Sequence, residues 1–399
     1  MHAPAPLSPD VLGTPEAIAD PYPAYRALRS PTPVRYVRLP AGAFTGLSTP
    51  LYSWALLRHA DVVAALRDTA TFSSEINAVN KVIPKLALVH DDPPRHTHLR
   101  RLVSKAFSAQ RIASLSDWIG PIVHELLDAA GRGPVEFMAA YAIPLPLRVI
   151  ATMLGIPDKD YPMFRRWSEA IAGYAGISAE ERALKAQEMK SYVDQAIAAR
   201  RAQPTADLLS VLVQAEVEGA SLSDAEIHSF ARVLLVAGHE TTTNLIGNMA
   251  ALLADRPELW RRAREDRTLV EPIIEEVLRY ESPVQRIGRV TTRPVRIGEA
   301  EIGAGELVDI FYGAANRDPA IFEEPDAFRP ERPANNQHVA FGLGIHFCLG
   351  AQLARLEARI TLNALLDRFP ELSRGEGTPV RQRAAPLSLG YKSLPLVLG

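Results

Sequence analysis

The spacing of apolar and polar residues along the chain predicts a mostly helical protein with a smaller β portion. Apolar and polar residues alternate over 33–39 and 51–57, which is typical of half-buried strands. Residues 295–311 are expected to form strand, turn and strand, and residues 312–340 a long loop rich in Pro, Asn and Asp. Elsewhere the apolar positions recur with a period near 3.6, which predicts helices over 61–68, 99–107, 111–131, 145–154, 158–174, 179–202, 268–280 and 348–368.

The longest predicted helix begins at Ser223. Ser223 and Glu226 have the spacing of a capping box, in which each side chain bonds the backbone of the other residue. Apolar residues keep a helical period from there to Leu252, and Pro257 ends the pattern. Such a helix is about 50 Å long at about 1.5 Å per residue, enough to cross a whole domain. Because no linker divides the chain, we expect a single α+β domain over residues 1–399.

Composition excludes several classes of protein. The 399 residues carry a formal charge of −2 without long runs of one sign, which argues against binding nucleic acid by bulk electrostatics. No apolar run reaches about 18 residues, and the first residues lack the pattern of a secretory signal. We therefore expect a soluble, cytoplasmic protein, without a nucleic-acid or membrane partner, that acts as a monomer.

Cys348 is the only cysteine, so it cannot form an internal disulfide. The helix predicted from residue 348 places it at a helix N-terminus, where backbone N–H groups favour a thiolate. The thiolate would be a nucleophile with His346 as its base, or the ligand of a metal in a large flat cofactor. A buried structural cysteine is the third interpretation, but the residues around it make this one less suitable: Phe341, Gly342, Gly344, His346 and Gly350.

The segment FGLGIHFCLG, residues 341–350, matches F-G-x-G-x-H-x-C-x-G at every specified position, and it resembles the haem-binding loop of the cytochrome P-450 family. Three further segments agree in order and spacing. EEVLR contains an E-x-x-R pair, Glu276 and Arg279, and is followed by FRPER at 328–332. AGHETT at 237–242 lies midway along the long helix, and HTHLR at 96–100 resembles a helix that contacts the haem propionates. Nearly the whole chain resembles a soluble bacterial member.

The resemblance implies haem b as cofactor, with Cys348 as the axial ligand of the iron, a ligand that favours O–O bond cleavage. It assigns the haem propionates to His96, Arg100, Arg289 and His346, whose side chains are donors suited to carboxylates. Other residues placed at the haem by the resemblance are Ala237, Phe341, Gly342 and Gly350.

Glu240 and Thr241 are, by the same resemblance, the acid and alcohol that supply protons to the oxygen being activated. The small Ala237 and Gly238 would let the helix approach the haem and loosen locally. The alternative is a Thr that bonds back to a helix carbonyl beside a solvated Glu.

Glu276 and Arg279 lie three residues apart on one helix face, among apolar residues. The resemblance implies a buried structural ion pair that Arg332 joins and that holds the Cys348 loop. A solvated surface pair is the alternative.

The substrate pocket is assigned by position in the family. A lid over residues 75–90 contains Asn80, Lys81 and Lys85, which would bind a substrate carboxylate or simply point into water. The residues expected to line the pocket are Val236, Ala237, Thr241, Val284, Ile287, Leu387 and Leu389.

The function implied is that of a haem-thiolate monooxygenase that uses O2 to hydroxylate or O-dealkylate a small to medium, mainly apolar molecule. No dinucleotide fingerprint follows a strand, so electrons are expected from a separate ferredoxin and an NAD(P)H-dependent reductase. A peroxide-driven peroxygenase and a haem-thiolate sensor are the alternatives. The residues expected to form a basic docking surface for the ferredoxin are Arg101, Lys105, Arg111, Arg355 and Arg359.

Overall fold

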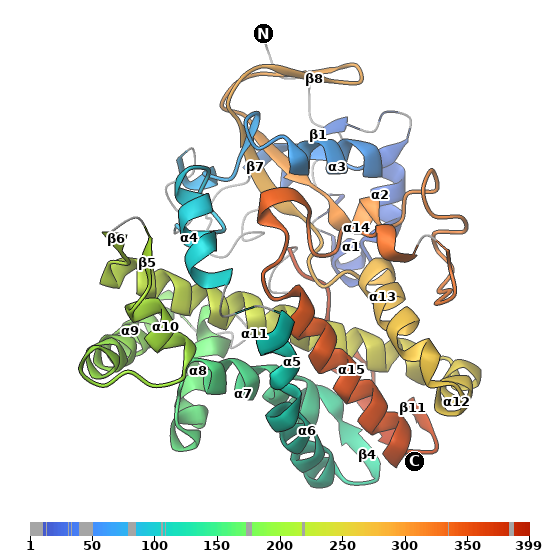
Figure 1. Ribbon diagram of the computed structural model, residues 1–399. Coiled ribbons are helices and arrows are strands. Elements are labelled where there is room, and N and C mark those ends of the chain that lie inside the picture. The colour runs from blue at the N-terminus through green and yellow to red at the C-terminus, as the bar shows by residue number, and fades with distance from the viewer. Residues whose placement is uncertain are drawn as a thin grey trace.

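The structure is a computed structural model, and Figure 1 shows that most helices lie on one side of a twisted sheet. The longest helix, α11, runs across the middle of the molecule, between the sheet and the lower helices in this view. The residues that the structure describes are 11–12, 14–30, 32, 34–39, 51–78, 85–104, 107, 109–172, 178–217, 220–333, 335–382 and 387–399.

The α-helices have the following bounds: α1 Pro15–Ala19, α2 Tyr22–Arg29, α3 His59–Arg67, α4 Arg95–Ser104, α5 Ala109–Ser114, α6 Ser116–Ala130, α7 Pro144–Met153, α8 Tyr161–Ala172, α9 Ala179–Ala202, α10 Leu208–Val213, α11 Asp224–Ala254, α12 Pro257–Glu265, α13 Val270–Tyr280, α14 Tyr312–Ala315 and α15 Ala351–Arg368. None of the helices in these ranges is long and apolar enough to cross a membrane.

The strands have the following bounds: β1 Val34–Leu39, β2 Leu51–Leu56, β3 Phe72–Ser73, β4 Gly133–Glu136, β5 Glu216–Val217, β6 Ala220–Ser221, β7 Ile287–Thr291, β8 Val295–Ile297, β9 Ala300–Ile302, β10 Leu307–Ile310, β11 Leu372–Arg374, β12 Val380–Arg381, β13 Tyr391–Ser393 and β14 Pro395–Leu398. The main sheet has the order β1-β2-β10-β7-β3. Its strands β2 and β10 are parallel, and the other neighbours are antiparallel.

Helix α11 contains 31 residues and begins as the sequence predicts. The Ser223 side chain accepts from the Glu226 N–H, and the Glu226 side chain accepts from the Ser223 N–H, which completes the capping box. Two glycines allow its close packing: a Cβ on Gly238 would lie 2.7 Å from Ile150 of α7, and one on Gly247 would lie 2.8 Å from the Met138 sulfur. The largest apolar core cluster surrounds α11 and includes residues of α7, α13 and α15.

The structure corrects several predicted elements. The predicted helix 111–131 is two helices, α5 and α6, separated at Leu115. Pro257 does not simply end α11; it begins α12, since proline suits the first turn of a helix. The segment 295–311 contains three strands instead of two, because β8 and β9 pair with each other while β10 joins the main sheet.

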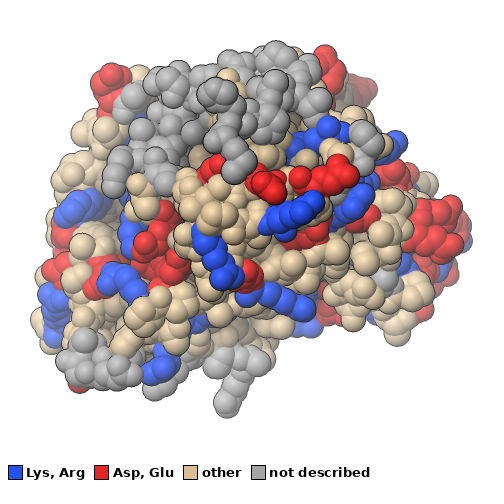
Figure 2. All heavy atoms as spheres, turned by 90° about the horizontal axis from the view of Figure 1, so that it is seen from above, with Lys and Arg blue, Asp and Glu red and all other residues tan. Residues whose placement is uncertain are grey.

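Charge is distributed as the small net charge suggests. On the described part of the face shown in Figure 2, basic and acidic side chains are interspersed with uncharged ones. Neither sign forms a continuous field on this face.

Candidate functional site

The loop that carries Cys348 has a backbone that requires glycine at two positions. Gly342 and Gly344 have φ values of 67° and 69°, in the left-handed region that glycine adopts readily. A Cβ on Gly344 would also lie 2.8 Å from the Leu66 carbonyl oxygen, so the loop could not pack against α3 with another residue there. The Cys348 N–H donates to the Phe341 carbonyl at 2.9 Å, which closes the loop just before α15.

Cys348 is exposed, although protein atoms surround it closely enough to desolvate the thiol. Because the Cys348 side chain is accessible and yet closely surrounded by protein atoms, we infer that it lines an internal space. Burial raises the pKa of the thiol, against the opposing effects of N–H groups from Gly350 and Ala351 and of the Arg100 charge. The N–H groups at the start of α15 thus favour the thiolate, as expected, but burial of the thiol opposes them more strongly.

Two histidines from distant segments meet beside this loop. The rings of His96 on α4 and His346 lie 4.3 Å apart between centroids. The His346 Nε2 also lies 2.8 Å from the Ser74 hydroxyl oxygen. Burial lowers the pKa of His346 to about 3, with a further contribution from the Arg289 charge. Burial also lowers the pKa of His96, as does the Arg100 charge.

The same place holds two arginines that form no ion pair in the described part of the chain. The Arg100 side chain also makes no hydrogen bond there, and its charge acts on Cys348. Arg289 is only 3% exposed, and its one hydrogen bond within the described chain goes to the Gly288 carbonyl at 2.8 Å. The buried Nε2 of His96 has no partner in that part of the chain either. Buried cationic and polar groups need partners, so this donor set fits a group with carboxylates, as the two propionates of haem are.

The residues predicted to act on oxygen lie on one turn of α11. Ala237 is exposed in the middle of α11, between the fully buried Leu235 and His239, which is only 2% exposed. The Thr241 hydroxyl donates to the Ala237 carbonyl at 2.6 Å. Helix α11 continues through this turn without interruption, so the expected local loosening is not observed. Gly238 instead faces α7, where it allows helix packing.

Glu240 does not extend freely into solvent. Its Oε1 accepts hydrogen bonds from the Ser388 hydroxyl at 2.5 Å and from the Gln382 amide at 3.2 Å. Ser388 is held by an isolated β-bridge to Val284. The segment that precedes β13 therefore fixes the carboxylate that the sequence predicts as the acid of the site, and no motif indicated Ser388 or Gln382.

The E-x-x-R pair is a buried ion pair, as predicted. Arg279 donates to both Glu276 oxygens, at 2.7 and 2.8 Å, and both side chains are 0% exposed. Arg332 is the third member, with its Nε 3.5 Å from Glu276. Arg279 also donates to the Asn316 carbonyl at 2.9 Å, and the Asn316 side chain accepts from the Val339 N–H at 2.7 Å. This cluster is thereby linked to the start of the Cys348 loop.

The adjacent Glu275 holds the Cys348 loop from another side. This role was not predicted from the sequence, although the segment EEVLR contains both Glu275 and Glu276. Arg355 of α15 donates to Glu275 at 2.6 and 2.8 Å, and the His338 Nε2 lies 3.0 Å from the same carboxylate. The Arg355 guanidinium also lies over the Phe341 ring, 4.5 Å from its centroid. Arg355 is thus a structural residue of the loop.

This pairing changes the predicted docking surface. Besides Arg355, Arg359 is also engaged, in an ion pair with Glu271 at 2.8 Å. Arg101 is exposed on α4. Lys105 and the side chain of Arg111 lie outside the described residues.

The predicted pocket residues are only partly brought together. Val284 and Ile287 are half-buried and pack on the sheet core. Leu387 is half-buried, and its carbonyl accepts from the Gln285 N–H. Leu389 is only 3% exposed and belongs to an apolar cluster with α2 and Phe311, which does not support a place in the pocket.

The predicted lid is described only in part. Lys85 is paired with Asp91 at 2.8 Å and with Glu75 at 3.4 Å, so its charge is already neutralised. Asn80, Lys81 and the side chain of Val236 lie outside the described residues.

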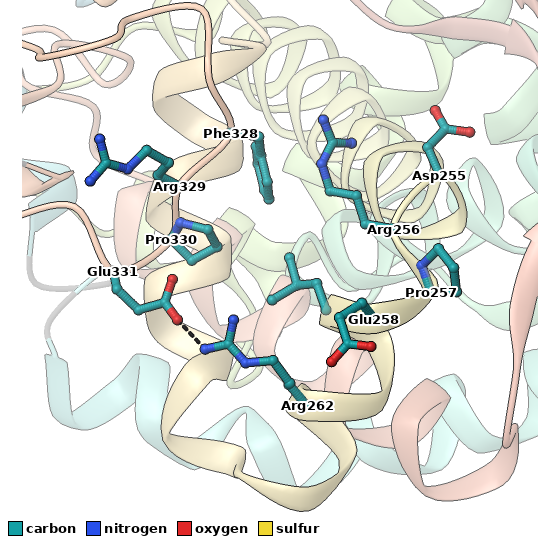
Figure 3. A pocket seen from close by; sticks show the side chains of 10 residues that line it. Asp255, Arg256, Pro257, Glu258, Arg262, Phe328, Arg329, Pro330 and Glu331 are labelled. Carbon is teal, nitrogen blue, oxygen red and sulfur yellow. Dashed lines mark hydrogen bonds and ion pairs between the residues drawn. The ribbon is translucent and has the colours of Figure 1, made fainter.

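A separate surface pocket of about 520 Å³ lies between the start of α12 and the 328–331 segment. In Figure 3, Arg262 reaches Glu331 and Arg256 lies beside Phe328, 4.8 Å from the ring centroid. No residue of the Cys348 loop or of the Ala237 turn lines it. It is therefore not part of the site built around Cys348.

Known proteins resemble this chain along almost its whole length. It is 39% identical to Cytochrome P450 107B1 of Saccharopolyspora erythraea, over 97% of this chain and 98% of that protein. It is 37% identical to Erythromycin C-12 hydroxylase of the same organism, over 87% and 89% of the two chains. The crystal structure of a cytochrome P450 from Bacillus megaterium with corticosterone superposes with a TM-score of 0.84 at 33% identity, over 96% of this chain and 99% of that one. The family model of cytochrome P450 matches residues 138–395, and the chain belongs to the cytochrome P450 family.

Proposed function

We propose that this cytochrome P450 hydroxylates a largely apolar organic molecule, with Cys348 as the thiolate ligand of haem b. Membership of the family makes the protein a haem b monooxygenase, and haem iron supplies the activation of O2 when it is bound. The observation that carries the residue assignment is the position of the single cysteine. Cys348 lines an internal space next to four basic side chains, and these have no ion-pair partner among the described residues.

The roles of the other residues follow from their positions. His96, Arg100, Arg289 and His346 bind the two propionates and so orient the flat cofactor over Cys348. Thr241 and Glu240 transfer protons on the opposite side, where Ala237 leaves room for substrate and O2. Glu276, Arg279 and Arg332 hold the loop and take no part in the chemistry.

Substrate size is suggested by the relatives. One is named for hydroxylating erythromycin, a macrolide, and a similar structure holds corticosterone, a steroid. We infer a substrate that reaches this size and offers few charges, since Lys85 is already paired. A panel of macrolides and steroids is therefore the first to test by the shift of the haem spectrum from low to high spin. The shift requires a ligand that displaces water from the iron.

The electron donor is proposed to be a ferredoxin reduced by an NAD(P)H-dependent reductase. Of the basic residues expected to contact it, Arg101 is exposed on α4, and Arg355 and Arg359 form ion pairs with Glu275 and Glu271. A charge reversal at Arg101 should slow reduction at low salt without changing substrate affinity. The cytoplasmic location, the single domain and the monomeric state stay predictions.

Turnover decides between the proposed function and its alternatives. The purified protein with substrate, O2, ferredoxin, reductase and NADH should give product in proportion to NADH consumed. Product formed only with hydrogen peroxide would indicate a peroxygenase. A protein that binds haem and gases but gives no product under either condition would be a sensor.

A further inference from the structure

A row of polar side chains follows one face of α11 into the core. Glu240, Asn244 and Asn248 are spaced by four residues, so they lie above one another on the helix. Asn244 and Asn248 are both 0% exposed. Burying amide groups is unfavourable unless they are hydrogen-bonded, so the presence of these asparagines in place of apolar residues requires an explanation.

The row faces Gln382, which follows β12, and residues 388–390. At one end, Glu240 accepts from Gln382 and Ser388. At the other, the Asn248 amide donates to the Leu389 carbonyl at 3.0 Å and to the Glu281 carbonyl at 3.1 Å. The row is thus held by neighbouring chain at both ends.

Between these two ends, polar atoms lie buried without partners. Neither the oxygen nor the nitrogen of the Asn244 amide has a hydrogen bond within the described chain, and the same holds for the Gln382 Oε1. A Cβ on Gly390 would lie 1.9 Å from the Asn244 Oδ1, so glycine is what leaves space for this side chain. Buried polar atoms of this kind are usually satisfied by ordered water.

At the Asn248 end, Arg381 links the row to a cavity at the surface. Arg381 donates to Asn248 at 3.2 Å and to Glu281 at 2.6 and 3.0 Å. Arg381 and Glu281 line a cavity of about 290 Å³ together with Arg26 and Asp326. The last two side chains are 61% and 47% exposed, so the cavity opens to solvent.

We propose that this row is the proton-uptake path of the enzyme, in which water held by the Asn244 and Gln382 amides connects the Glu281–Arg381 cavity with Ser388 and Glu240. The proposal rests on the proposed role of Glu240. Hydroxylation of one C–H bond by O2 consumes two electrons and two protons and releases one water, so protons must reach the site from solvent. The Ser388 hydroxyl passes a proton to Glu240 and regains one from the adjacent water, and the amides hold the water without ionising.

A purely structural role accounts for Asn248 but not for Asn244. The Asn248 amide donates to the backbone carbonyls of Glu281 and Leu389, which ties α11 to the end of α13 and to the chain just before β13. The Asn244 amide has no hydrogen bond in the described chain, yet it is fully buried beside Gly390, whose carbonyl accepts from the Gln382 N–H. A leucine of similar volume would fill the same space without the cost of burying an amide.

The test replaces Asn244 by that leucine in the holoenzyme. Asn244→Leu should lower product per NADH by at least about threefold, with hydrogen peroxide making up the difference, which is a smaller effect than the about 100-fold for loss of a general acid. The solvent deuterium isotope effect on product formation should rise, while the spectrum of the reduced carbon monoxide complex stays unchanged. Thr243→Val is the matched control, because it removes another buried polar group that has no partner in the described chain from the same helix. It should leave the product yield per NADH, the solvent isotope effect and the carbon monoxide spectrum unchanged.

A readout independent of turnover is a high-resolution crystal structure. Ordered water should lie within hydrogen-bond distance of the Asn244 amide in the wild-type protein and be lost in Asn244→Leu. A wild-type structure without ordered water at the Asn244 amide would refute the proposed proton path. If the leucine variant does not fold, Gln382→Met tests the same path from the facing segment, with the same expected loss of coupling and the same refutation by unchanged coupling.

Glu240→Gln separates the path from the proposed function. Uncoupling by Glu240→Gln together with normal coupling in Asn244→Leu would refute the path alone. Normal coupling in Glu240→Gln would refute the role of the acid itself, and the path with it.

Discussion

Three of the Arg–Glu pairs on helix α13 differ mainly in exposure, so they test how burial changes the contribution of an ion pair to stability. The two side chains of Arg279–Glu276 are 0% exposed, and those of Arg355–Glu275 are 22% and 18% exposed. The side chains of Arg359–Glu271 are 47% and 49% exposed. Replacing each arginine by methionine removes the charge and keeps much of the apolar stem.

The expected loss of unfolding free energy follows burial. Arg279→Met leaves a fully buried carboxylate and removes donors from three carbonyls, so we expect a loss of about 3–5 kcal/mol. Arg355→Met removes two charge-assisted hydrogen bonds at a partly exposed site, for which about 1.5–3 kcal/mol is expected. Arg359→Met should cost less than about 1 kcal/mol, since an exposed pair is screened by water.

The assay is guanidinium unfolding of the three holoproteins and the wild type. Midpoints at unchanged slope give the differences in free energy. Tryptophan fluorescence reports the fold through the buried Trp260, and the haem absorbance reports cofactor loss separately. If Arg279→Met yields no folded protein, Arg279→Lys keeps the charge without the fork and should still lose more than Arg359→Met. Equal losses in the three variants would refute the argument that burial sets the contribution of each pair.

Three further predictions concern single residues. Cys348→Ala should abolish the red-shifted Soret band of the reduced carbon monoxide complex, because no other cysteine can replace it, and a retained band would mean that the ligand is another group. Thr241→Ala should keep haem and substrate binding but consume NADH with release of peroxide; an unchanged product yield would remove its hydroxyl from proton transfer. Burial raises the pKa of Glu357 well above its usual value, so the folded protein holds a proton that the unfolded chain loses above about pH 4.5. Stability should therefore fall by about 1.4 kcal/mol per pH unit above that pH until the folded carboxyl ionises, and Glu357→Gln should lack this contribution, whereas parallel stability curves for the two proteins would contradict it.

Elements with strong local signals were predictable from the sequence. The capping box set the start of α11, and the bounds of α9 agree with the predicted 179–202. Short strands that pair over long distances were not predictable. β4 at 133–136 pairs with β14 at 395–398, and three or four residues carry too little periodicity to show such a pairing.

The residues of the site likewise fall into those that the sequence predicted and those that it did not. The cysteine and the buried Glu276–Arg279 pair were found because each belongs to a compact motif. The partners of Glu240 were missed because Gln382 and Ser388 are 142 and 148 residues away in sequence. Leu389 was placed in the pocket from its neighbours in sequence, but the apolar cluster of α2 takes up its side chain.

Helix α13 explains how an irregular segment can position Cys348 accurately. Residues 312–340 contain little regular structure, and such a segment would be expected to move. Glu275 and Glu276 are consecutive, so they leave the helix about 100° apart and reach different parts of the chain. Glu276 and Arg279 bind the carbonyl and N–H groups of 316–329, at the beginning and middle of the segment. Glu275 binds His338 and Arg355, at its end and beyond Cys348. One rigid helix therefore fixes the loop on both sides of the cysteine, and the position of the thiolate depends on two neighbouring carboxylates that do not touch it.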